Sequence, residues 1–337
     1  MTQDSINVVV AMDFSDAILD GLRAISPRLN IERHHPNVPD PAWEEAEVVY
    51  TAHRFPDPAQ APRLRWIQLH TAGIDHAVRQ PILRAEDVDV TTASGIHITQ
   101  MSEYVLAMML AFAYRLPKML ELQSRAEWPE KAGKIFAPGE LRGQTLGLVG
   151  YGSINREIAR LANALGMTVL ACKRDLKHLE DRDSYVEPGT GDPEAAIPER
   201  IYPAEAVASM AAECDFVVVT IPLVDGAPPV ISEAVLEAMK KTAVLINVAR
   251  GAVVDEAALI TALSSGKIGG AALDVFEEEP LPSTSPLWNL ENVIISPHIS
   301  GNSLRYHEKA AALFAENLHR YLEKKPLLNV VDRKRGY

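Results

Sequence analysis

Residues 145–175, TLGLVGYGSINREIARLANALGMTVLACKRD, decide the fold, because they predict a strand, a glycine turn, a helix and a second strand in that order. Gly150 permits the tight turn after the first strand, and Gly152 lets a pyrophosphate approach the backbone. The helix carries apolar residues at helical spacing, at Ile158, Leu161, Ala162 and Leu165. A helix that begins directly after such a turn offers N–H groups and a positive dipole end to a phosphate. The stretch therefore predicts a dinucleotide-binding fold.

Two features of this stretch depart from the usual pattern. Asn155 stands where a third glycine normally serves helix–strand packing, so we expect a small shift of the helix without loss of binding. Lys173 and Arg174 end the second strand, where a carboxylate normally accepts hydrogen bonds from a ribose. These cations can bind a 2′-phosphate instead, which favours NADP(H) over NAD(H) as the cofactor. Asp175 follows one residue further round the turn and is expected to point elsewhere.

Strands and helices alternate along most of the 337 residues, a length that suits two domains. Apolar runs without strict alternation, typical of parallel sheets covered on both faces, predict strands at 6–12, 46–51, 64–69, 88–93, 145–150, 167–172, 215–222, 243–249, 269–276 and 292–298. The amphipathic helix at 303–326 is expected to return to the first domain. The predicted fold class is α/β, with two Rossmann-like doubly wound domains, 1–98 plus 303–337 and 99–302, the second inserted into the first.

Three further segments have their own predictions. Residues 33–43 hold several prolines and are predicted to form a loop. Residues 99–125 predict a long apolar helix with few breaks before Pro117, used both in a domain core and in a contact between subunits. Residues 175–203 are rich in charge, proline and glycine, and are interpreted as a surface excursion or a poorly ordered loop.

The composition is globular, with 47% hydrophobic and 23% charged residues, and the net charge of -12 argues against a nucleic-acid partner. Cys172 and Cys214 each border an apolar run and are expected to be buried reduced thiols. The N-terminus lacks the pattern of a signal peptide, and the longest apolar run, 105–113, is too short to cross a bilayer. We therefore expect a cytoplasmic protein without a membrane partner, and we predict no metal site.

Charged residues follow several strands of the second series. Arg250 follows the strand at 243–249 and could clamp a carboxylate in a bidentate pair. Three acids, Glu277, Glu278 and Glu279, follow the next strand, and His298 ends the last one. If these two strands are neighbours, one of the acids can reach His298 and favour its protonated form, which is a proton donor.

With these residues assembled, the chain resembles the D-isomer-specific 2-hydroxyacid dehydrogenases, which are NAD(P)-dependent enzymes of two Rossmann-like domains. The resemblance covers nearly the whole chain and rests on an ordered set of motifs: TAGIDHAV (71–78), SGIHITQMSEYVLAMMLAF (94–112), GELRGQTLGLVGYGSI (139–154), LINVARGAVVDEAAL (245–259), ALDVFEEEPLP (272–282) and SPHISG (296–301). It implies that residues 1–98 plus 303–337 form a flavodoxin-like substrate-binding domain and residues 99–302 the dinucleotide-binding domain.

The resemblance also implies roles for individual residues. Arg250 would hold the substrate carboxylate, His298 would act as acid and base on the substrate oxygen, and Glu279 would pair with His298. The backbone around Ala72 and Gly73 would bind the substrate carboxylate together with Arg250. Ser153 and Ile154 would meet the pyrophosphate, Asp274 would bond the nicotinamide carboxamide, and Pro222, Val248 and Ala249 would flank its ring. The cofactor-binding set implied as a whole is Gly150, Tyr151, Gly152, Ser153, Ile154, Lys173, Arg174, Pro222, Val248, Ala249, Asp274 and Gly301.

The function expected from the resemblance is the interconversion of a small 2-oxo acid and its D-2-hydroxy acid, with NADP(H) favoured, by a homodimer. Lys173 and Arg174 make the chain similar to the glyoxylate/hydroxypyruvate reductases that prefer NADPH. Two alternatives stay open at this point. One is an NAD-dependent dehydrogenase of the phosphoglycerate or lactate type, and the other is a non-catalytic module that senses dinucleotides. The sequence does not choose the substrate.

Overall fold

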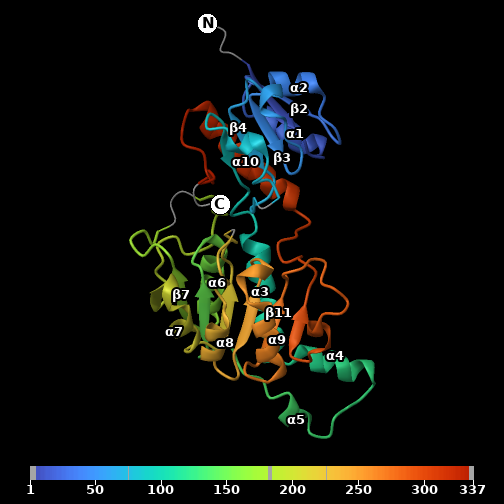
Figure 1. Cartoon of the computed structure of the whole chain (residues 1–337), viewed down its shortest axis with the longest axis vertical. Helices are drawn as coiled ribbons and strands as arrows, with labels where there is room; N and C mark the ends of the chain where they lie inside the picture. The colour runs from blue at the N-terminus through green and yellow to red at the C-terminus, as the bar shows by residue number, and fades with distance from the viewer. Residues whose placement is uncertain (1–4, 75, 181–183, 225, 334–337) are drawn as a thin grey trace. The chain divides into compact units, whose positions relative to one another are not determined.

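The computed structural model describes residues 5–74, 76–180, 184–224 and 226–333. The chain forms two compact units, and each has its own sheet (Figure 1). Unit 1 comprises Met1–Ile96, Asp183–Glu187 and Ser303–Tyr337, and unit 2 comprises His97–Arg182 and Pro188–Asn302. The first boundary thus falls after residue 96, because His97 already caps the first helix of unit 2.

Unit 1 is built on a parallel sheet with the order β2-β1-β3-β4-β5, which is the flavodoxin-like order. Its strands are β1 (Ile6–Val10), β2 (Leu29–Arg33), β3 (Val48–Thr51), β4 (Trp66–Leu69) and β5 (Asp89–Thr91). Both faces of the central strands are buried; all residues of β3 and β4, for example, are inaccessible to solvent. This double burial explains why these strands are continuous apolar runs.

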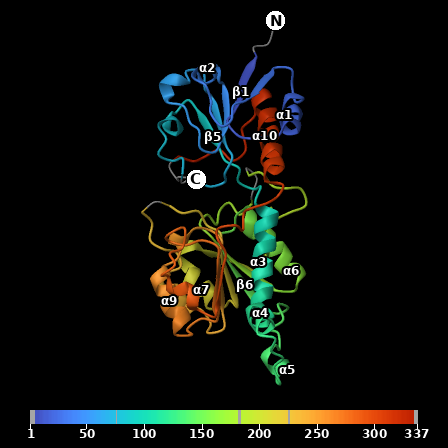
Figure 2. The ribbon, with the colours of Figure 1, turned by 90° about the vertical axis from the view of Figure 1, so that its right-hand side faces the viewer.

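Helices α1 (Asp16–Arg23) and α10 (Tyr306–Leu322) lie side by side on one face of this sheet (Figure 2). Phe314 and Leu318 of α10 are fully buried against β1, β3 and β4, so the last helix does return to the first part of the chain, as predicted. The other face is covered by α2 (Asp40–Glu45) and by the short 3-10 helices η1 (Pro58–Gln60) and η2 (Pro81–Arg84).

Unit 2 is built on a second parallel sheet, of seven strands in the order β12-β11-β10-β9-β6-β7-β8. Its strands are β6 (Thr145–Val149), β7 (Thr168–Lys173), β8 (Arg200–Pro203), β9 (Phe216–Val219), β10 (Val244–Asn247), β11 (Gly270–Leu273) and β12 (Val293–Ile295). The strand order reverses between β6 and β9, and such a switch point leaves a crevice at the carboxyl ends of the strands.

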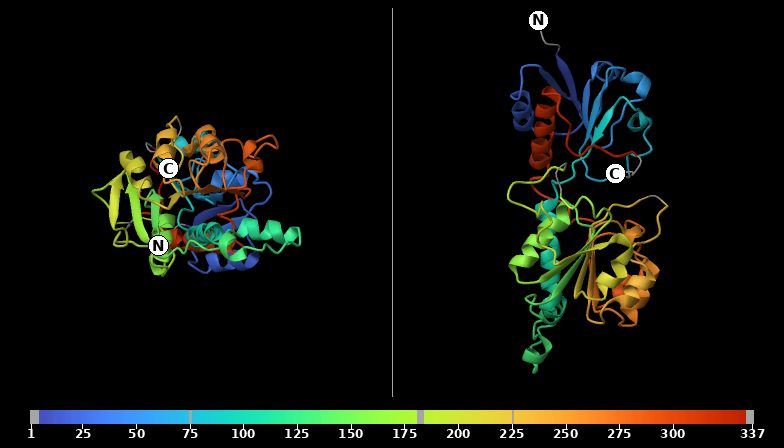
Figure 3. Two further views of the ribbon diagram at one scale, coloured as in Figure 1. Left: turned by 90° about the horizontal axis from the view of Figure 1, so that it is seen from below. Right: turned by 90° about the vertical axis from the view of Figure 1, so that its left-hand side faces the viewer.

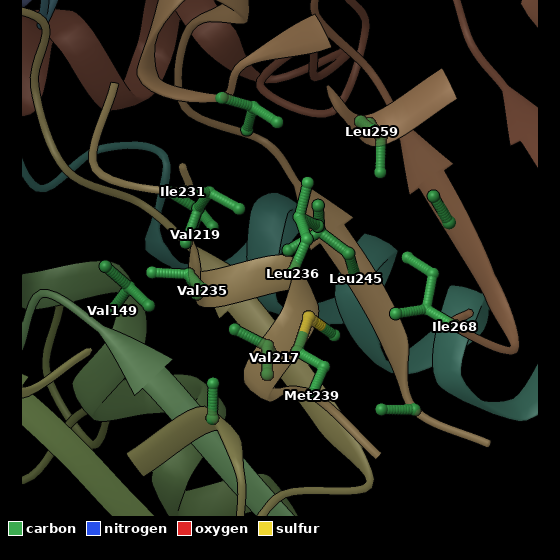
Figure 4. Close-up of a cluster of buried hydrophobic side chains, with 14 of the residues drawn as sticks. Val149, Val217, Val219, Ile231, Val235, Leu236, Met239, Leu245, Leu259 and Ile268 are labelled. Atoms are coloured by element: carbon green, nitrogen blue, oxygen red, sulfur yellow. The ribbon is translucent and has the colours of Figure 1, made fainter. Parts of the chain in front are cut away.

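Helices cover both faces of the seven-stranded sheet. Helices α3 (Ile98–Ala113) and α6 (Ser153–Ala164) lie on one face, and α7 (Val207–Ala211) and α9 (Glu256–Ser264) on the other (Figure 2). The right-hand view of Figure 3 shows the same layers from the opposite side. Helix α8 (Glu233–Ala238) joins the second face, where Leu236 packs among aliphatic side chains of β9 and β10 (Figure 4). The remaining elements are α4 (Leu116–Ser124), α5 (Ala132–Ile135), η3 (Ala204–Ala206), η4 (Gly251–Val253) and η5 (Pro286–Asn289).

Two predictions for local structure are wrong, one in unit 1 and one in unit 2. The loop predicted at 33–43 contains the start of α2, where Pro39 and Asp40 open the helix. The helix predicted at 99–125 ends at Ala113, and α4 begins only at Leu116. The break is set by Arg115, whose φ of 53° lies in the left-handed region, and Pro117 then fits in the first turn of α4.

The segment at 175–203 is more ordered than predicted. It ends in strand β8, which pairs with β7, and its residues 184–187 belong to unit 1. There the N–H of Tyr185 donates to Oδ1 of Asn329 at 3.1 Å, and Lys309 lies 3.0 Å from Glu187. Residues 181–183 lie outside the described part of the chain.

Cys172 and Cys214 are free and buried, as predicted. Burial raises the pKa of each thiol to about 12, so both stay protonated near neutral pH. Within the described residues, we find no helix with the length and apolar character needed to cross a membrane.

Candidate active site

The predicted site residues of unit 2 lie where parallel strands end. The glycine turn follows β6, Lys173 ends β7, and Arg250 follows β10. Asp274 follows β11, and His298 follows β12. All of these strands run parallel in one sheet, so their carboxyl ends share one edge. This edge is where ligands bind in open α/β sheets.

The glycine turn has the shape that a pyrophosphate requires. Gly150 has a φ of +88°, and a Cβ at this position would lie 2.6 Å from a methyl group of Ile221. Gly152 is the N-cap of α6, and a Cβ there would meet only open space. Among the described residues no side chain caps this helix end, so the first N–H groups of α6 are available to an anion. The residues therefore fit a dinucleotide pyrophosphate.

Asn155, at the position of the absent third glycine, joins helix α6 to strand β6 by hydrogen bonds of its side chain. Its side chain is fully buried, and its Nδ2 donates to the carbonyl of Val149 at 3.2 Å and to that of Gly150 at 2.6 Å. The buried Oδ1 of Asn155 accepts no hydrogen bond from the described residues. Asn155 thus ties the start of α6 to the end of β6.

Lys173 and Arg174 stand at the end of β7, as the sequence indicates. The Lys173 ammonium donates to the carbonyl of Leu179 at 3.3 Å, and Arg174 is exposed. Asp175 accepts from the N–H of Lys177 and from Nδ1 of His178, each at 2.9 Å, so its carboxylate closes its own turn. These hydrogen bonds lower the pKa of Asp175 to about 2, and the bond from His178 is the largest cause. Asp175 is therefore engaged within its own turn, and its orientation away from a ribose stays a prediction.

His298 and Glu279 form a direct pair. Strands β11 and β12 are neighbours, and of the three acids it is Glu279 that reaches His298, with Oε2 2.7 Å from Nδ1. The other oxygen of Glu279 accepts from the N–H of Phe276 at 3.0 Å, which fixes the carboxylate. Because Glu279 occupies Nδ1, the Nε2 atom is the position of His298 that can serve a further partner.

Arg250 is half-buried, and its backbone is shaped by Asn247. The Oδ1 of Asn247 accepts from the N–H of Ala249 at 3.1 Å, and its Nδ2 donates to the carbonyl of Arg250 at 3.0 Å. Gly251 brings this segment against the backbone of Phe276, since a Cβ at Gly251 would lie 1.8 Å from the Phe276 carbonyl carbon. The segment that carries Arg250 therefore touches the segment that leads to Glu279.

Asp274 holds the loop that carries His298. Its Oδ1 accepts from the hydroxyl of Ser296 and from the N–H of Ile299 at 2.9 Å, and its Oδ2 accepts from the N–H of Ser300 at 2.8 Å. The N–H of His298 donates to the Asp274 carbonyl at 2.9 Å, and His298 has a φ of 54°. A left-handed conformation is unfavourable for histidine, so these bonds stabilise a strained position. The fully buried Asp274 carboxylate is thus engaged within the protein, and its contact with nicotinamide stays a prediction.

The other predicted residues lie on the same edge or in unit 1. Val248 and Ala249 are buried after β10, Pro222 is exposed after β9, and the carbonyl of Gly301 accepts from Nε2 of Gln100 at 3.2 Å. Ser153 and Ile154 open α6 and are half-buried. Ala72 and Gly73 are half-buried in unit 1, where the Thr71 hydroxyl donates to the carbonyl of Gly73 at 2.8 Å. Residue 75 of the TAGIDHAV motif lies outside the described residues.

Several residues that shape this edge were missed by the sequence analysis. The Tyr104 hydroxyl lies 2.6 Å from the Ser296 hydroxyl, which in turn donates to Asp274. Since the single hydroxyl hydrogen of Ser296 goes to Asp274, Tyr104 is the donor in its own bond. Burial is the largest cause of the raised pKa of Tyr104, which keeps this hydroxyl protonated. Polar residues inside apolar runs, such as Asn247 in LINVA, are the signal that could have revealed this network.

The comparisons with known proteins agree on one family. The family model "D-isomer specific 2-hydroxyacid dehydrogenase, NAD binding domain" matches residues 106–300. The chain is 35% identical over 270 residues to a glyoxylate reductase of Pyrococcus furiosus, covering 77% of this chain and 73% of the relative. It is also 35% identical over 268 residues to an (S)-sulfolactate dehydrogenase of Chromohalobacter salexigens, covering 78% and 79%.

A solved structure extends the similarity to the whole fold. The D-isomer specific 2-hydroxyacid dehydrogenase from Xanthobacter autotrophicus Py2, in complex with NADPH and MES, has a TM-score of 0.77 and 29% identity, covering 99% of this chain and 100% of that chain. The family match spans more than half of the 337 residues, and the fold and the relatives agree with it. The chain belongs to the D-isomer specific 2-hydroxyacid dehydrogenase family, and is a dehydrogenase of 2-hydroxy acids that uses a nicotinamide dinucleotide.

Proposed function

We propose that the protein reduces a small 2-oxo acid to its D-2-hydroxy acid with NADPH, and catalyses the reverse oxidation with NADP⁺. The observation that carries this proposal is the Glu279–His298 pair, at 2.7 Å, on the same carboxyl edge of the sheet as a glycine turn that fits a pyrophosphate. A fixed carboxylate and an imidazole at the carboxyl edge of the sheet are what proton transfer to a substrate oxygen requires.

His298 is the proposed acid and base. The bound dihydronicotinamide supplies the hydride for the substrate carbonyl carbon. Nε2 of His298 donates a proton to the carbonyl oxygen in reduction and removes it in oxidation, while Glu279 holds the ring at Nδ1. The carboxylate also stabilises the protonated ring, so it favours the form that donates. The left-handed backbone of His298, held by Asp274, sets the direction of this ring.

Arg250 is the proposed partner of the substrate carboxylate. Its fork of N–H groups suits a bidentate pair with a carboxylate, and its main contribution would be to hold the acid in a reactive pose. The backbone around Ala72 and Gly73 is the proposed second contact of the same carboxylate. Several relatives are glyoxylate reductases, which supports a small substrate. The similarity to an (S)-sulfolactate dehydrogenase supports a substrate with a second anionic group.

NADP(H) is the proposed cofactor because Lys173 ends β7, Arg174 follows it, and Asp175 is engaged with His178. No carboxylate of this stretch then serves as the ribose acceptor that NAD-using members employ. The similar structure from Xanthobacter autotrophicus Py2 contains NADPH, and a glyoxylate/hydroxypyruvate reductase of Sinorhizobium meliloti, 25% identical, contains NADP, which supports the same preference.

A substrate-by-cofactor activity matrix on the purified protein tests the proposal. We expect reduction of glyoxylate, hydroxypyruvate or a related 2-oxo acid, with a higher kcat/KM for NADPH than for NADH. Arg174→Ala should weaken NADPH more than NADH, because only the former carries the 2′-phosphate. A higher kcat/KM with NADH would refute the cofactor assignment and favour a phosphoglycerate- or lactate-type dehydrogenase. Tight cofactor binding without turnover of any 2-oxo acid would favour a dinucleotide sensor.

We also propose a homodimer and a cytoplasmic location. Exposed apolar side chains gather on α4 and just before and after it, where Tyr114, Leu116, Leu120 and Trp128 are 46%, 45%, 55% and 91% exposed. Large apolar surface of this kind marks a protein contact.

A further inference from the structure

The segment that follows β7 is attached to the glycine turn. Tyr151, between Gly150 and Gly152, is only 3% exposed, and its hydroxyl donates to Oδ2 of Asp192 at 2.6 Å. Burial first, and then the bond to Asp192, raise the pKa of Tyr151, so this hydroxyl remains a donor. Asp192 is itself 6% exposed, so both partners of this bond are shielded from water.

Asp192 also stabilises the segment's own backbone. Its Oδ1 accepts from the N–H of Ala196 and its Oδ2 from the N–H of Ile197, both at 3.0 Å. Ala195 and Ile197 pack on the same apolar cluster as Tyr151 and Ile158. One carboxylate therefore joins the turn after β6 to a stretch of chain about forty residues later.

Helix α6 provides a second attachment through two charged residues that face inward. The guanidinium of Arg156, 2% exposed, donates to the carbonyls of Asp192 and Leu179 and lies over the ring of Tyr151, 4.8 Å from its centroid. Glu157 accepts from the N–H of Gly191 at 2.7 Å. Buried charges are stable only with such partners. These contacts of Tyr151, Arg156 and Glu157 are the docking site that holds the segment after β7 on the glycine turn and on α6.

Leu179 links this docking site to the predicted phosphate-binding residues. Its carbonyl accepts from Arg156 of α6 and, at 3.3 Å, from the ammonium of Lys173 at the end of β7. A lysine side chain has four rotatable bonds, and a fixed acceptor restricts where its ammonium lies. The position of Lys173 therefore depends on where the segment is held.

We propose that the described residues of 176–199 in unit 2 are a structural part of the cofactor site, and that Tyr151, Arg156 and Asp192 hold Lys173 where it receives the 2′-phosphate of NADP(H). The segment would thus act as a specificity-determining element, and Asp192 and Arg156 as positioning residues that do not touch the cofactor. This inference rests on the proposed use of NADP(H). It explains why this charged stretch is anchored on the turn predicted to bind the pyrophosphate and on helix α6.

Direct binding measurements test the inference. The dissociation constants of NADPH and NADH are measured by fluorescence titration for the wild-type protein, for Asp192→Asn and for Arg156→Lys. Hydrogen exchange at the amides of Ala196 and Ile197 reports whether the segment has loosened. We expect faster exchange at these amides and an NADPH Kd that rises about tenfold, the size of one charge-assisted hydrogen bond lost or misplaced, with a smaller change for NADH.

A matched control lies at the opposite edge of the same sheet. Asp215 accepts from the N–H of Thr145 at 2.9 Å and from Lys240 at 2.8 Å, at the amino ends of the strands, so Asp215→Asn should leave both dissociation constants unchanged. If Asp192→Asn does not fold, Glu157→Gln loosens the same segment at Gly191 and should give the same pattern.

The outcomes separate this inference from the cofactor assignment. A wild-type protein that binds NADH more tightly than NADPH overturns both. A wild-type preference for NADPH, combined with loosened variants whose two dissociation constants are unchanged or rise equally, overturns the inference alone. Faster exchange together with a selective loss of NADPH affinity supports it.

Discussion

The Nδ1 atom of His298 lies 2.7 Å from Oε2 of Glu279, while Oε1 of Glu279 is held by the N–H of Phe276. This arrangement predicts that substitution of His298 lowers kcat more than substitution of Glu279. His298→Asn removes the proton donor, so kcat should fall about 10²–10⁴-fold with little change in the NADPH dissociation constant. Glu279→Gln keeps a neutral acceptor for Nδ1–H but no charge, so kcat should fall less, about tenfold. Steady-state kinetics and a cofactor titration provide the measurement.

Glu278→Gln is the control for this pair, because Glu278 is the adjacent exposed carboxylate. It should retain wild-type turnover. Unchanged turnover in His298→Asn, or an equal loss in Glu278→Gln and Glu279→Gln, would contradict the assignment of the acid–base pair.

The second prediction concerns Asp274, whose carboxylate holds Ser296, Ile299 and Ser300. In Asp274→Asn an amide NH₂ replaces one acceptor oxygen, and a buried N–H of the loop loses its partner. The loop should loosen around His298, and kcat should fall about 10–100-fold, as expected for a misplaced catalytic group. The change is measured as kcat and as the NADPH dissociation constant.

Tyr104→Phe is the companion variant, because it removes the hydroxyl that donates to Ser296 but leaves Asp274 intact. It should lower kcat in the same direction and by less. If instead Asp274→Asn raised the NADPH dissociation constant and left kcat unchanged, the main role of Asp274 would be the nicotinamide contact implied by the family resemblance.

Most of the fold could be predicted from the sequence, because central strands of a parallel sheet are buried on both faces. The common edge on which the site residues lie could be predicted as well. Runs such as DFVVVTIP and AVLINVA leave few alternatives to a strand. Parallel strands also end at a common edge, so the residues that follow them, such as Arg250 and His298, could be expected to lie on that edge before any distance was known.

The strands that were not predicted, β2 and β8, are both edge strands. The burial of β2 alternates, with only Leu29 and Ile31 buried, and β8 buries only Tyr202. A strand with one neighbour covers less apolar surface, so its sequence resembles a loop; RIYP follows directly on a charged stretch. The hydrophobic pattern is weak there for a physical reason.

The attachment of residues 188–199 could not be predicted because it depends on side chains far apart in the sequence. Arg156 and Glu157 occupy the inward face of α6, where the helical pattern leads one to expect apolar residues. The burial of Arg156 is stable only because the carbonyls of Asp192 and Leu179 accept its hydrogen bonds. Local periodicity does not contain this information.

The third prediction concerns the contact between subunits. Replacing Leu116 and Leu120 of α4 with serine removes exposed apolar surface from the proposed interface. Light scattering after size-exclusion chromatography should give twice the chain mass for the wild type and a single chain mass for the double variant, because the lost apolar contact weakens association. Leu304→Ser, at an exposed leucine outside this region, should stay dimeric. A wild-type protein that elutes as a monomer would contradict the homodimer.

The last prediction concerns Asn155, whose Nδ2 donates to the carbonyls of Val149 and Gly150. Asn155→Ala leaves two buried acceptors with fewer donors, so the free energy of unfolding should fall by about 1–3 kcal/mol. The side chain is fully buried and bonded to the end of β6, so the NADPH dissociation constant should change little. Asn163→Ala, at an exposed position of the same helix, is the control and should have almost no effect on stability. Denaturant unfolding of the three proteins measures the difference; a variant with wild-type stability and weakened NADPH binding would instead place the Asn155 side chain at the cofactor.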